Sequence, residues 1–105
     1  MSDHADFQPV ADADAIKPGQ MMRVDVAGHR LLLANVEGEV FAVDDTCSHE
    51  DSSLYLGCLK GYHIKCSLHG SRFDLRTGQP MEEPADEPIA TYAVRITDGR
   101  IEVAA

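Results

Sequence analysis

Two short segments, each placing one cysteine near one histidine, constrain this chain more than any other feature. The first is Cys47-Ser48-His49, and the second, after sixteen intervening residues, is Cys66-Ser67-Leu68-His69. Thiolate and imidazole groups are common ligands of transition metals in proteins. A fold that uses all four side chains at one metal centre must bring the two segments together on neighbouring loops.

Two thiolates and two neutral imidazoles suit a 2Fe–2S cluster in which the cysteines bind one iron and the histidines the other. Because the imidazoles are uncharged, the cluster is less negative and accepts an electron more easily, at the histidine-bound iron. Zinc is the main alternative, since Cys₂His₂ is also a regular zinc ligand set. The common zinc pattern, however, has both cysteines in one pair and both histidines in the other, whereas each pair here is mixed. The pattern therefore favours the cluster.

Length and charge narrow the class of protein. The chain has 105 residues, the size of one domain, and we expect a single domain over 1–105. Its formal net charge of −9 argues against a nucleic-acid partner and against anionic membranes. Three cysteines do not suit a secreted disulfide scaffold, and the N-terminus lacks the basic and apolar regions of a secretory signal. We therefore expect a cytoplasmic protein.

Short strands separated by turn residues are predicted along much of the chain. The pair Asp98-Gly99 favours the positive φ angles of a type I′ hairpin turn, and alternation places Tyr92, Val94 and Ile96 on one face. No long window has the apolar period of a capped helix, although 11–16 could form one helical turn. We expect an all-β fold of about eight or nine strands, a small sandwich or barrel. The expected strands are 21–26, 29–36, 39–43, 91–96 and 100–103, with 7–10 as a possible first strand.

The strand pattern lapses in two central segments. Residues 44–61 are rich in Cys, His, Ser and Gly, and residues 77–88 combine three prolines with acidic residues. Long loops on a small β scaffold are frequent locations of functional residues. Both segments are therefore candidates for the functional part of the chain.

The two cysteine–histidine segments, the second followed by Gly70, resemble the ligand motifs of Rieske-type 2Fe–2S ferredoxins and Rieske domains. The segment 72–78 is similar to the strand and turn after the family's second ligand loop, and Pro84-Ala85 falls where the family has a proline loop over its cluster. The resemblance extends from about Phe7 to Val103. It implies a small Rieske-type β-sandwich or barrel with an inserted cluster-binding subdomain at approximately 46–85.

The resemblance also implies roles for the four candidate ligands. Cys47 and Cys66 would bind the inner iron of one Rieske-type 2Fe–2S cluster, and His49 and His69 the outer iron near the protein surface. The chain would then be a one-electron carrier and not an enzyme. Its partners would be a flavin-dependent ferredoxin reductase and a terminal aromatic-ring-hydroxylating oxygenase, and a monomer would suit such a carrier.

Two alternatives from other classes remain at this point. The first is a small subunit of another multi-component reductase, of the nitrite reductase type. Many such subunits keep the Rieske fold without the cluster ligands, so the full ligand set here counts against it. The second is a structural zinc-binding interaction module.

Departures from the respiratory branch of the family predict the redox potential. That branch has two further cysteines joined as a disulfide, where this chain has Ser52 and Leu68. The chain keeps a serine at Ser71 but has Phe73 where a tyrosine donates a hydrogen bond to sulfur. Donors to sulfur stabilise the extra negative charge of the reduced cluster. We therefore expect a midpoint potential in the lower half of the Rieske range, which runs from about −150 to +300 mV.

Several other residues carry predictions of their own. Cys58 is expected to be a buried, inert thiol, because free cysteine often behaves as a small hydrophobe. Gly57, Gly61 and Gly70 are expected to let the backbone approach the cluster closely, although Gly57 and Gly61 could equally be simple turn residues. Three histidines are not expected to be ligands: His4, His29 and His63.

Acidic residues concentrate beside both central segments. They form either a negative rim suited to salt-sensitive docking or an ordinary solvated loop. The residues concerned are Glu50, Asp51, Glu82, Glu83, Asp86 and Glu87.

Overall fold

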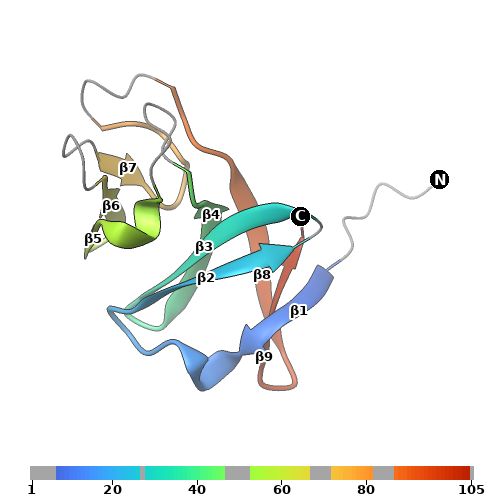
Figure 1. Cartoon of the computed structure of the whole chain (residues 1–105). Helices are drawn as coiled ribbons and strands as arrows, with labels where there is room; N and C mark the ends of the chain where they lie inside the picture. Colours follow the sequence, from blue (N-terminus) through green and yellow to red (C-terminus); the bar gives the residue numbers. More distant parts are fainter. Residues whose placement is uncertain (1–6, 27, 47–52, 67–71, 82–86, 105) are drawn as a thin grey trace.

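The computed structural model describes residues 7–26, 28–46, 53–66, 72–81 and 87–104, and within these ranges the chain is all-β, as predicted (Figure 1). The described residues form nine strands and two single-turn 3₁₀ helices. None of the described helices has the length and apolar character needed to cross a membrane. The elements are β1 (Phe7–Asp12), η1 (Ala13–Ala15), β2 (Met21–Val26), β3 (His29–Val36), β4 (Glu39–Asp44), η2 (Leu54–Leu56), β5 (Cys58–Lys60), β6 (His63–Lys65), β7 (Arg72–Asp74), β8 (Thr91–Thr97) and β9 (Arg100–Ala104).

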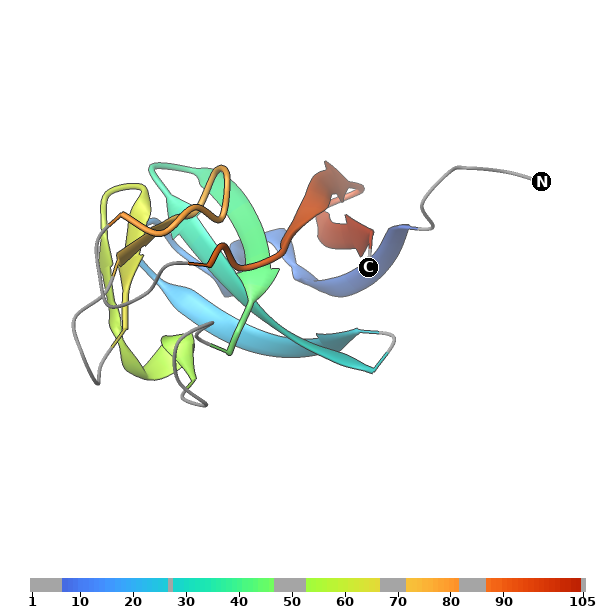
Figure 2. The same cartoon turned by 90° about the horizontal axis from the view of Figure 1, so that it is seen from above.

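The strands form two antiparallel sheets. The larger has the order β1-β9-β8-β4-β3-β2, and its edge strands β1 and β2 approach each other, so that the sheet nearly closes into a barrel. The smaller consists of β5-β6-β7 and is inserted between β4 and β8 in the chain. Figure 2 shows this small sheet on one side of the larger one. The small sheet falls within the 46–85 segment assigned to the expected subdomain.

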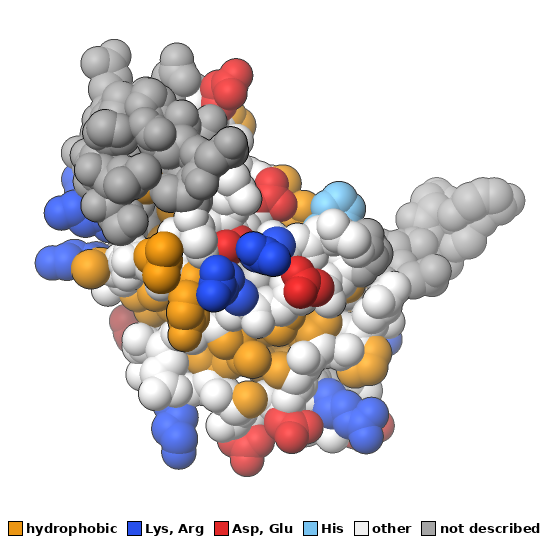
Figure 3. Space-filling model, in the orientation of Figure 1, with side chains coloured by type: hydrophobic (Ala, Val, Ile, Leu, Met, Phe, Trp, Pro, Cys, Tyr) orange, Lys and Arg blue, Asp and Glu red, His pale blue; other side chains and the backbone are white. Residues whose placement is uncertain are grey.

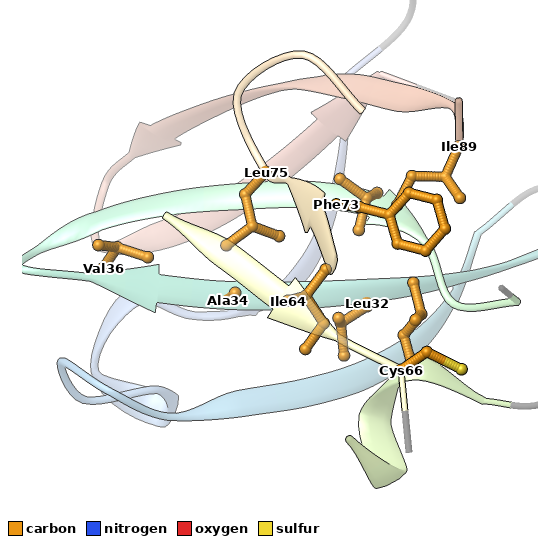
Figure 4. Close-up of a cluster of buried hydrophobic side chains, with 10 residues drawn as sticks. Leu32, Ala34, Val36, Ile64, Cys66, Phe73, Leu75 and Ile89 are labelled. Atoms are coloured by element: carbon orange, nitrogen blue, oxygen red, sulfur yellow. The ribbon is translucent and has the colours of Figure 1, made fainter. Parts of the chain in front are cut away.

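Strand β3 is buried on both of its faces. Alternate side chains point into the barrel, and the others point toward the small sheet. Leu31 and Leu33 pack in the barrel with Ile101 and other side chains of β4 and β9. On the opposite face, which we call the subdomain core, ten buried residues pack between β3, β4 and the small sheet (Figure 4). They are Leu32, Ala34, Val36, Val43, Leu54, Ile64, Cys66, Phe73, Leu75 and Ile89.

The predicted hairpin at Asp98-Gly99 is present, with the expected backbone geometry. Asp98 and Gly99 have φ angles of 53° and 74°, and both central residues of a type I′ turn require positive φ. Glu37 and Gly38 join β3 to β4 in the same way, with φ angles of 54° and 96°. On β8 the predicted face is buried unevenly, since Ile96, near the hairpin tip, is 51% exposed.

Candidate metal centre

Of the four predicted ligands, Cys66 lies in the described part of the chain, directly after β6. Its side chain is only 2% exposed and belongs to the subdomain core. Figure 4 shows its sulfur at the edge of this group of side chains. A sulfur atom held there by apolar neighbours can serve as a ligand on the buried side of a metal centre. The other three, Cys47, His49 and His69, lie outside the described residues.

The described ends of the first ligand segment, residues 47–52, are joined to each other. Thr46 and Ser53 form an antiparallel bridge, and the Leu54 amide donates a hydrogen bond to the Asp45 carbonyl oxygen. The Asp45 amide in turn donates to the Arg30 carbonyl oxygen over 3.1 Å. The residues on either side of this segment are therefore held next to each other at the end of β4.

The ends of the second ligand segment, residues 67–71, lie on paired strands. Strand β6 runs antiparallel to β7, and Lys65 pairs with Arg72. The chain on both sides of the next undescribed segment, 82–86, is also tied to this region. The Met81 amide donates to the Arg72 carbonyl oxygen over 2.7 Å, and the Ile89 amide donates to the Gly78 carbonyl oxygen over 2.8 Å.

The subdomain core connects the flanks of all three segments. Leu54 follows the first segment, Cys66 and Phe73 flank the second, and Ile89 follows the third. Because these four side chains belong to one buried cluster, the two ligand segments start from the same part of the molecule. The convergence required by the sequence motif is therefore present in their described flanks.

A buried carboxylate that sequence reasoning did not single out lies beside the first ligand segment. Asp45 is 1% exposed, and its two oxygens accept hydrogen bonds from the Ser53 hydroxyl at 2.6 Å and from the Tyr55 amide at 3.0 Å. On the outer side, Arg23 Nη1 lies 3.4 Å from the Ser53 hydroxyl, and the Arg23 guanidinium lies 4.9 Å from the centre of the Tyr55 ring. The sequence feature that could have identified Asp45 is its position at the end of a strand, two residues before the first cysteine.

A second charged group stabilises the turn after β7. The Arg76 guanidinium donates to the Asp74 carboxylate at 2.9 Å and lies 4.5 Å from the centre of the Tyr62 ring. This hydrogen bond lowers the pKa of Asp74 below its ordinary value, because it favours the ionised carboxylate. The turn leads from the second ligand segment toward Pro80 and the acidic, proline-containing region.

The described charges do not separate into one acidic surface. On the outer face of the small sheet, Lys60 and Lys65 are exposed, and Lys65 lies opposite Arg72. On the face shown in Figure 3, acidic and basic side chains are interspersed around exposed hydrophobic atoms. Of the residues proposed for a negative rim, Glu87 is described and exposed, and the others lie outside the described residues. The rim remains a prediction.

The prediction that Cys58 is buried is wrong, because the structure places it on the exposed outer face of β5. Strand β5 is an edge of the small sheet, and Cys58 lies opposite Lys65, so its side chain shares the solvent-facing side. Alternation on a three-residue strand was too short to reveal this face from the sequence.

The glycines and histidines have different outcomes. Gly57 approaches the Lys65 backbone closely, whereas Gly61, with φ of 57° and open space around it, is a turn residue. His29 is exposed at the start of β3, and His63 is half-buried at the start of β6. His4 and Gly70 lie outside the described residues.

Comparison with known proteins agrees with this architecture. The Rieske [2Fe-2S] domain family matches residues 6–93. The ferredoxin component of the p-cumate 2,3-dioxygenase system of Pseudomonas putida is 39% identical over 101 residues, which cover 94% of this chain and 86% of that protein.

Two solved structures are also similar. The ferredoxin of carbazole 1,9a-dioxygenase from Nocardioides aromaticivorans IC177 has a TM-score of 0.90 at 34% identity, covering 93% of this chain and 96% of its own. A chain in a complex of reduced oxygenase and oxidised ferredoxin in carbazole 1,9a-dioxygenase has a TM-score of 0.89 at 32% identity. That match covers 96% of this chain and 94% of the other.

These similarities confirm three expectations from the sequence. The fold is of the Rieske type, the cofactor is one Rieske-type 2Fe–2S cluster, and the protein is an electron-carrying ferredoxin component and not itself an enzyme. Two solved structures named as candidate nitrite reductase small subunits share the fold, with TM-scores of 0.82 and 0.88, but at 21% and 22% identity they support the fold alone. The chain belongs to the Rieske [2Fe-2S] domain family.

Proposed function

We propose that Cys47, His49, Cys66 and His69 hold the cluster, with the cysteines on the inner iron and the histidines on the outer iron. The observation that carries this assignment is the position of Cys66, whose buried sulfur lies at the edge of the core shared by the flanks of both ligand segments. The donor set fits, because two thiolates and two imidazoles are the ligands of a Rieske centre.

The bound cluster supplies a one-electron redox couple. The chain's own residues determine the position of the cluster in the molecule and the surface beside it. Leu54, Ile64 and Phe73 are fully buried in the same cluster as Cys66, so they would exclude water from the side of the metal centre held by this cysteine. Exposed Tyr55 and Leu56 lie on η2, close in sequence to the first ligand segment. Exposed apolar side chains of this kind suit brief contact with a partner protein.

We propose a flavin-dependent reductase as the electron donor and a terminal aromatic-ring-hydroxylating oxygenase as the acceptor. The p-cumate dioxygenase relative supports this pairing, as does the similar chain from a ferredoxin–oxygenase complex. We expect the carrier to act as a cytoplasmic monomer, without nucleic-acid or membrane partners.

Electron paramagnetic resonance tests the ligand assignment. The dithionite-reduced wild-type protein should give a Rieske-type signal, and Cys47→Ser, His49→Ala, Cys66→Ser and His69→Ala should each abolish it. His63→Ala is the matched control, because His63 lies on β6 close to Cys66 in sequence and is not assigned as a ligand. A silent spectrum from loaded, reduced wild-type protein, or a ligand variant that keeps the wild-type signal, would contradict the assignment.

Electron transfer kinetics test the partners. A flavin-dependent ferredoxin reductase and a terminal aromatic-ring-hydroxylating oxygenase from the source organism should reduce and oxidise the purified ferredoxin in stopped-flow experiments. If charged surfaces guide docking, both rates should change with sodium chloride concentration, because salt screens exposed charges. Rates that are independent of salt would exclude electrostatic docking. A complete absence of electron exchange would exclude these two proteins as partners.

A further inference from the structure

We propose that Asp45 is a positioning residue that holds together the two ends of the first ligand segment. The inference rests on the proposed ligand set, which places Cys47 and His49 within that segment. Asp45 precedes the segment, while both groups bonded to its carboxylate follow it: the hydroxyl of Ser53 and the amide of Tyr55. One side chain therefore connects the chain before the ligands with the chain after them.

The backbone supports the same junction. The Asp45 amide is bonded to the Arg30 carbonyl oxygen on β3, and the Asp45 carbonyl oxygen accepts the Leu54 amide. Thr46 and Ser53 form a bridge directly beside it. This attachment connects the start of the ligand segment to β3, whose residues from Leu31 to Val36 are buried and closely packed.

The burial of Asp45 makes these bonds necessary. A carboxylate that is 1% exposed has little access to water, so its oxygens depend on protein donors. Both oxygens have one: the contact from the Ser53 hydroxyl is 2.6 Å, a length typical of a hydrogen bond to a charged acceptor, and that from the Tyr55 amide is 3.0 Å. No buried side-chain nitrogen or oxygen among the described residues lacks a partner.

The carboxylate is better suited to this junction than an amide. An asparagine could accept from the Tyr55 amide through its oxygen, but its NH₂ group would then face the Ser53 hydroxyl, which must act as acceptor. Ser53 is also approached by Arg23 Nη1 at 3.4 Å, a second donor directed at the same oxygen. Asp45→Asn therefore retains the volume of the side chain but weakens the junction.

The test compares variants with and without the junction in the cluster-loaded protein. Asp45→Asn and Ser53→Ala each weaken or remove the Ser53 contact, whereas Ser53→Thr keeps a hydroxyl. Asp44→Asn is the matched control, because the neighbouring Asp44 carboxylate accepts from the Tyr92 hydroxyl at 2.7 Å. That contact connects β4 to β8 and not the ends of the ligand segment.

Three quantities are measured: the rate of loss of visible absorbance in excess chelator, the resonance spectrum of the reduced cluster, and the thermal unfolding midpoint. Asp45→Asn and Ser53→Ala should lose the cluster about tenfold faster, the factor expected for one charge-assisted hydrogen bond. Their spectra should broaden or shift, because the ligand segment samples more geometries. Ser53→Thr and Asp44→Asn should match the wild type in the rate of cluster loss and in the resonance spectrum.

The proposal is overturned if Asp45→Asn and Ser53→Ala lose the cluster at the wild-type rate with an unchanged spectrum. It is overturned equally if only the unfolding midpoint falls, since a general supporting role would produce that result. Failure of the ligand assignment looks different: the wild type would then lack the Rieske signal, or Cys47→Ser would keep it, whatever the behaviour of Asp45.

Discussion

Gly57 packs so closely against Lys65 that a Cβ atom at position 57 would overlap the Lys65 carbonyl oxygen. Gly57 ends the short helix that follows the first ligand segment, and Lys65 immediately precedes Cys66. The contact therefore joins the polypeptide near one cysteine–histidine pair to the polypeptide at the other. Only a residue without a side chain permits this separation.

Gly57→Ala should move η2 away from β6 and accelerate loss of the cluster. The added methyl group meets backbone and not a flexible side chain, so we expect destabilisation of about 1–3 kcal/mol. Urea unfolding and absorbance decay in chelator measure the two effects. The control is Gly61→Ala, where a positive φ costs about 1–2 kcal/mol but the surrounding space is open. Equal cluster lifetimes in the two variants would show that the contact does not position the ligands.

Phe73→Tyr should raise the midpoint potential. Phe73 is fully buried in the same core as Cys66, and the resemblance to respiratory Rieske proteins implies a sulfur-directed hydroxyl at this position. A net contribution of about 1 kcal/mol from one added hydrogen bond corresponds to about 40 mV for one electron. A redox titration followed by circular dichroism measures the shift.

The control for this substitution is Phe41→Tyr, which adds the same hydroxyl to a partly buried ring that packs against Tyr62. Its midpoint potential should equal that of the wild type. A wild-type midpoint in the upper half of the Rieske range would contradict the interpretation that Phe73 lowers the potential.

Tyr92→Phe should alter stability in alkaline solution. Burial, together with the hydrogen bond to Asp44, raises the pKa of Tyr92 from 10.0 to about 12. Between these values the folded chain keeps a proton that the unfolded chain releases, so this contribution to stability falls as the pH rises from 10 to 12. The variant should lose about 0.5–1.5 kcal/mol at neutral pH. In urea unfolding series its stability should decline less steeply across that interval, and parallel curves would refute the assignment.

Cys58 should be the single thiol that reacts rapidly with iodoacetamide in the native, cluster-loaded protein. It is exposed, whereas Cys66 is buried and, with Cys47, is proposed to bind iron. Mass spectrometry should show one label before and three labels after removal of the cluster under denaturing, reducing conditions. Cys58→Ala should show no rapid labelling and an unchanged visible spectrum. Rapid labelling of Cys47 in the native protein would argue against its role as a ligand.

The strands and hairpins could be predicted from the sequence because their signals are local. The Asp98-Gly99 turn favours positive φ angles, and the flanking residues alternate over the length of β8. The continuous apolar run of β3 was consistent with a strand but did not show that both its faces are covered. The second face of β3 is covered because the small sheet packs against the larger one, and this packing depends on contacts between segments distant in the sequence.

The exposure of Cys58 shows the same limit at the scale of one residue. A strand of three residues has too few positions for alternation to distinguish its faces, and the side that faces solvent depends on pairing with β6. Asp45 was overlooked for a related reason. Its chemistry as a carboxylate is evident from the sequence, but its burial and its two hydrogen bonds depend on residues brought to it by folding.

The sequence by itself determined the chemistry of this protein. Two mixed cysteine–histidine pairs favour an iron–sulfur centre over zinc, because thiolates and imidazoles are metal ligands and their arrangement differs from the common zinc pattern. Only the tertiary structure decided how the ends of those segments are held: by Asp45 across the first segment, by β6 and β7 across the second, and by the contact between Gly57 and Lys65. These contacts join residues through space, and their energies depend on burial and geometry that no local pattern contains.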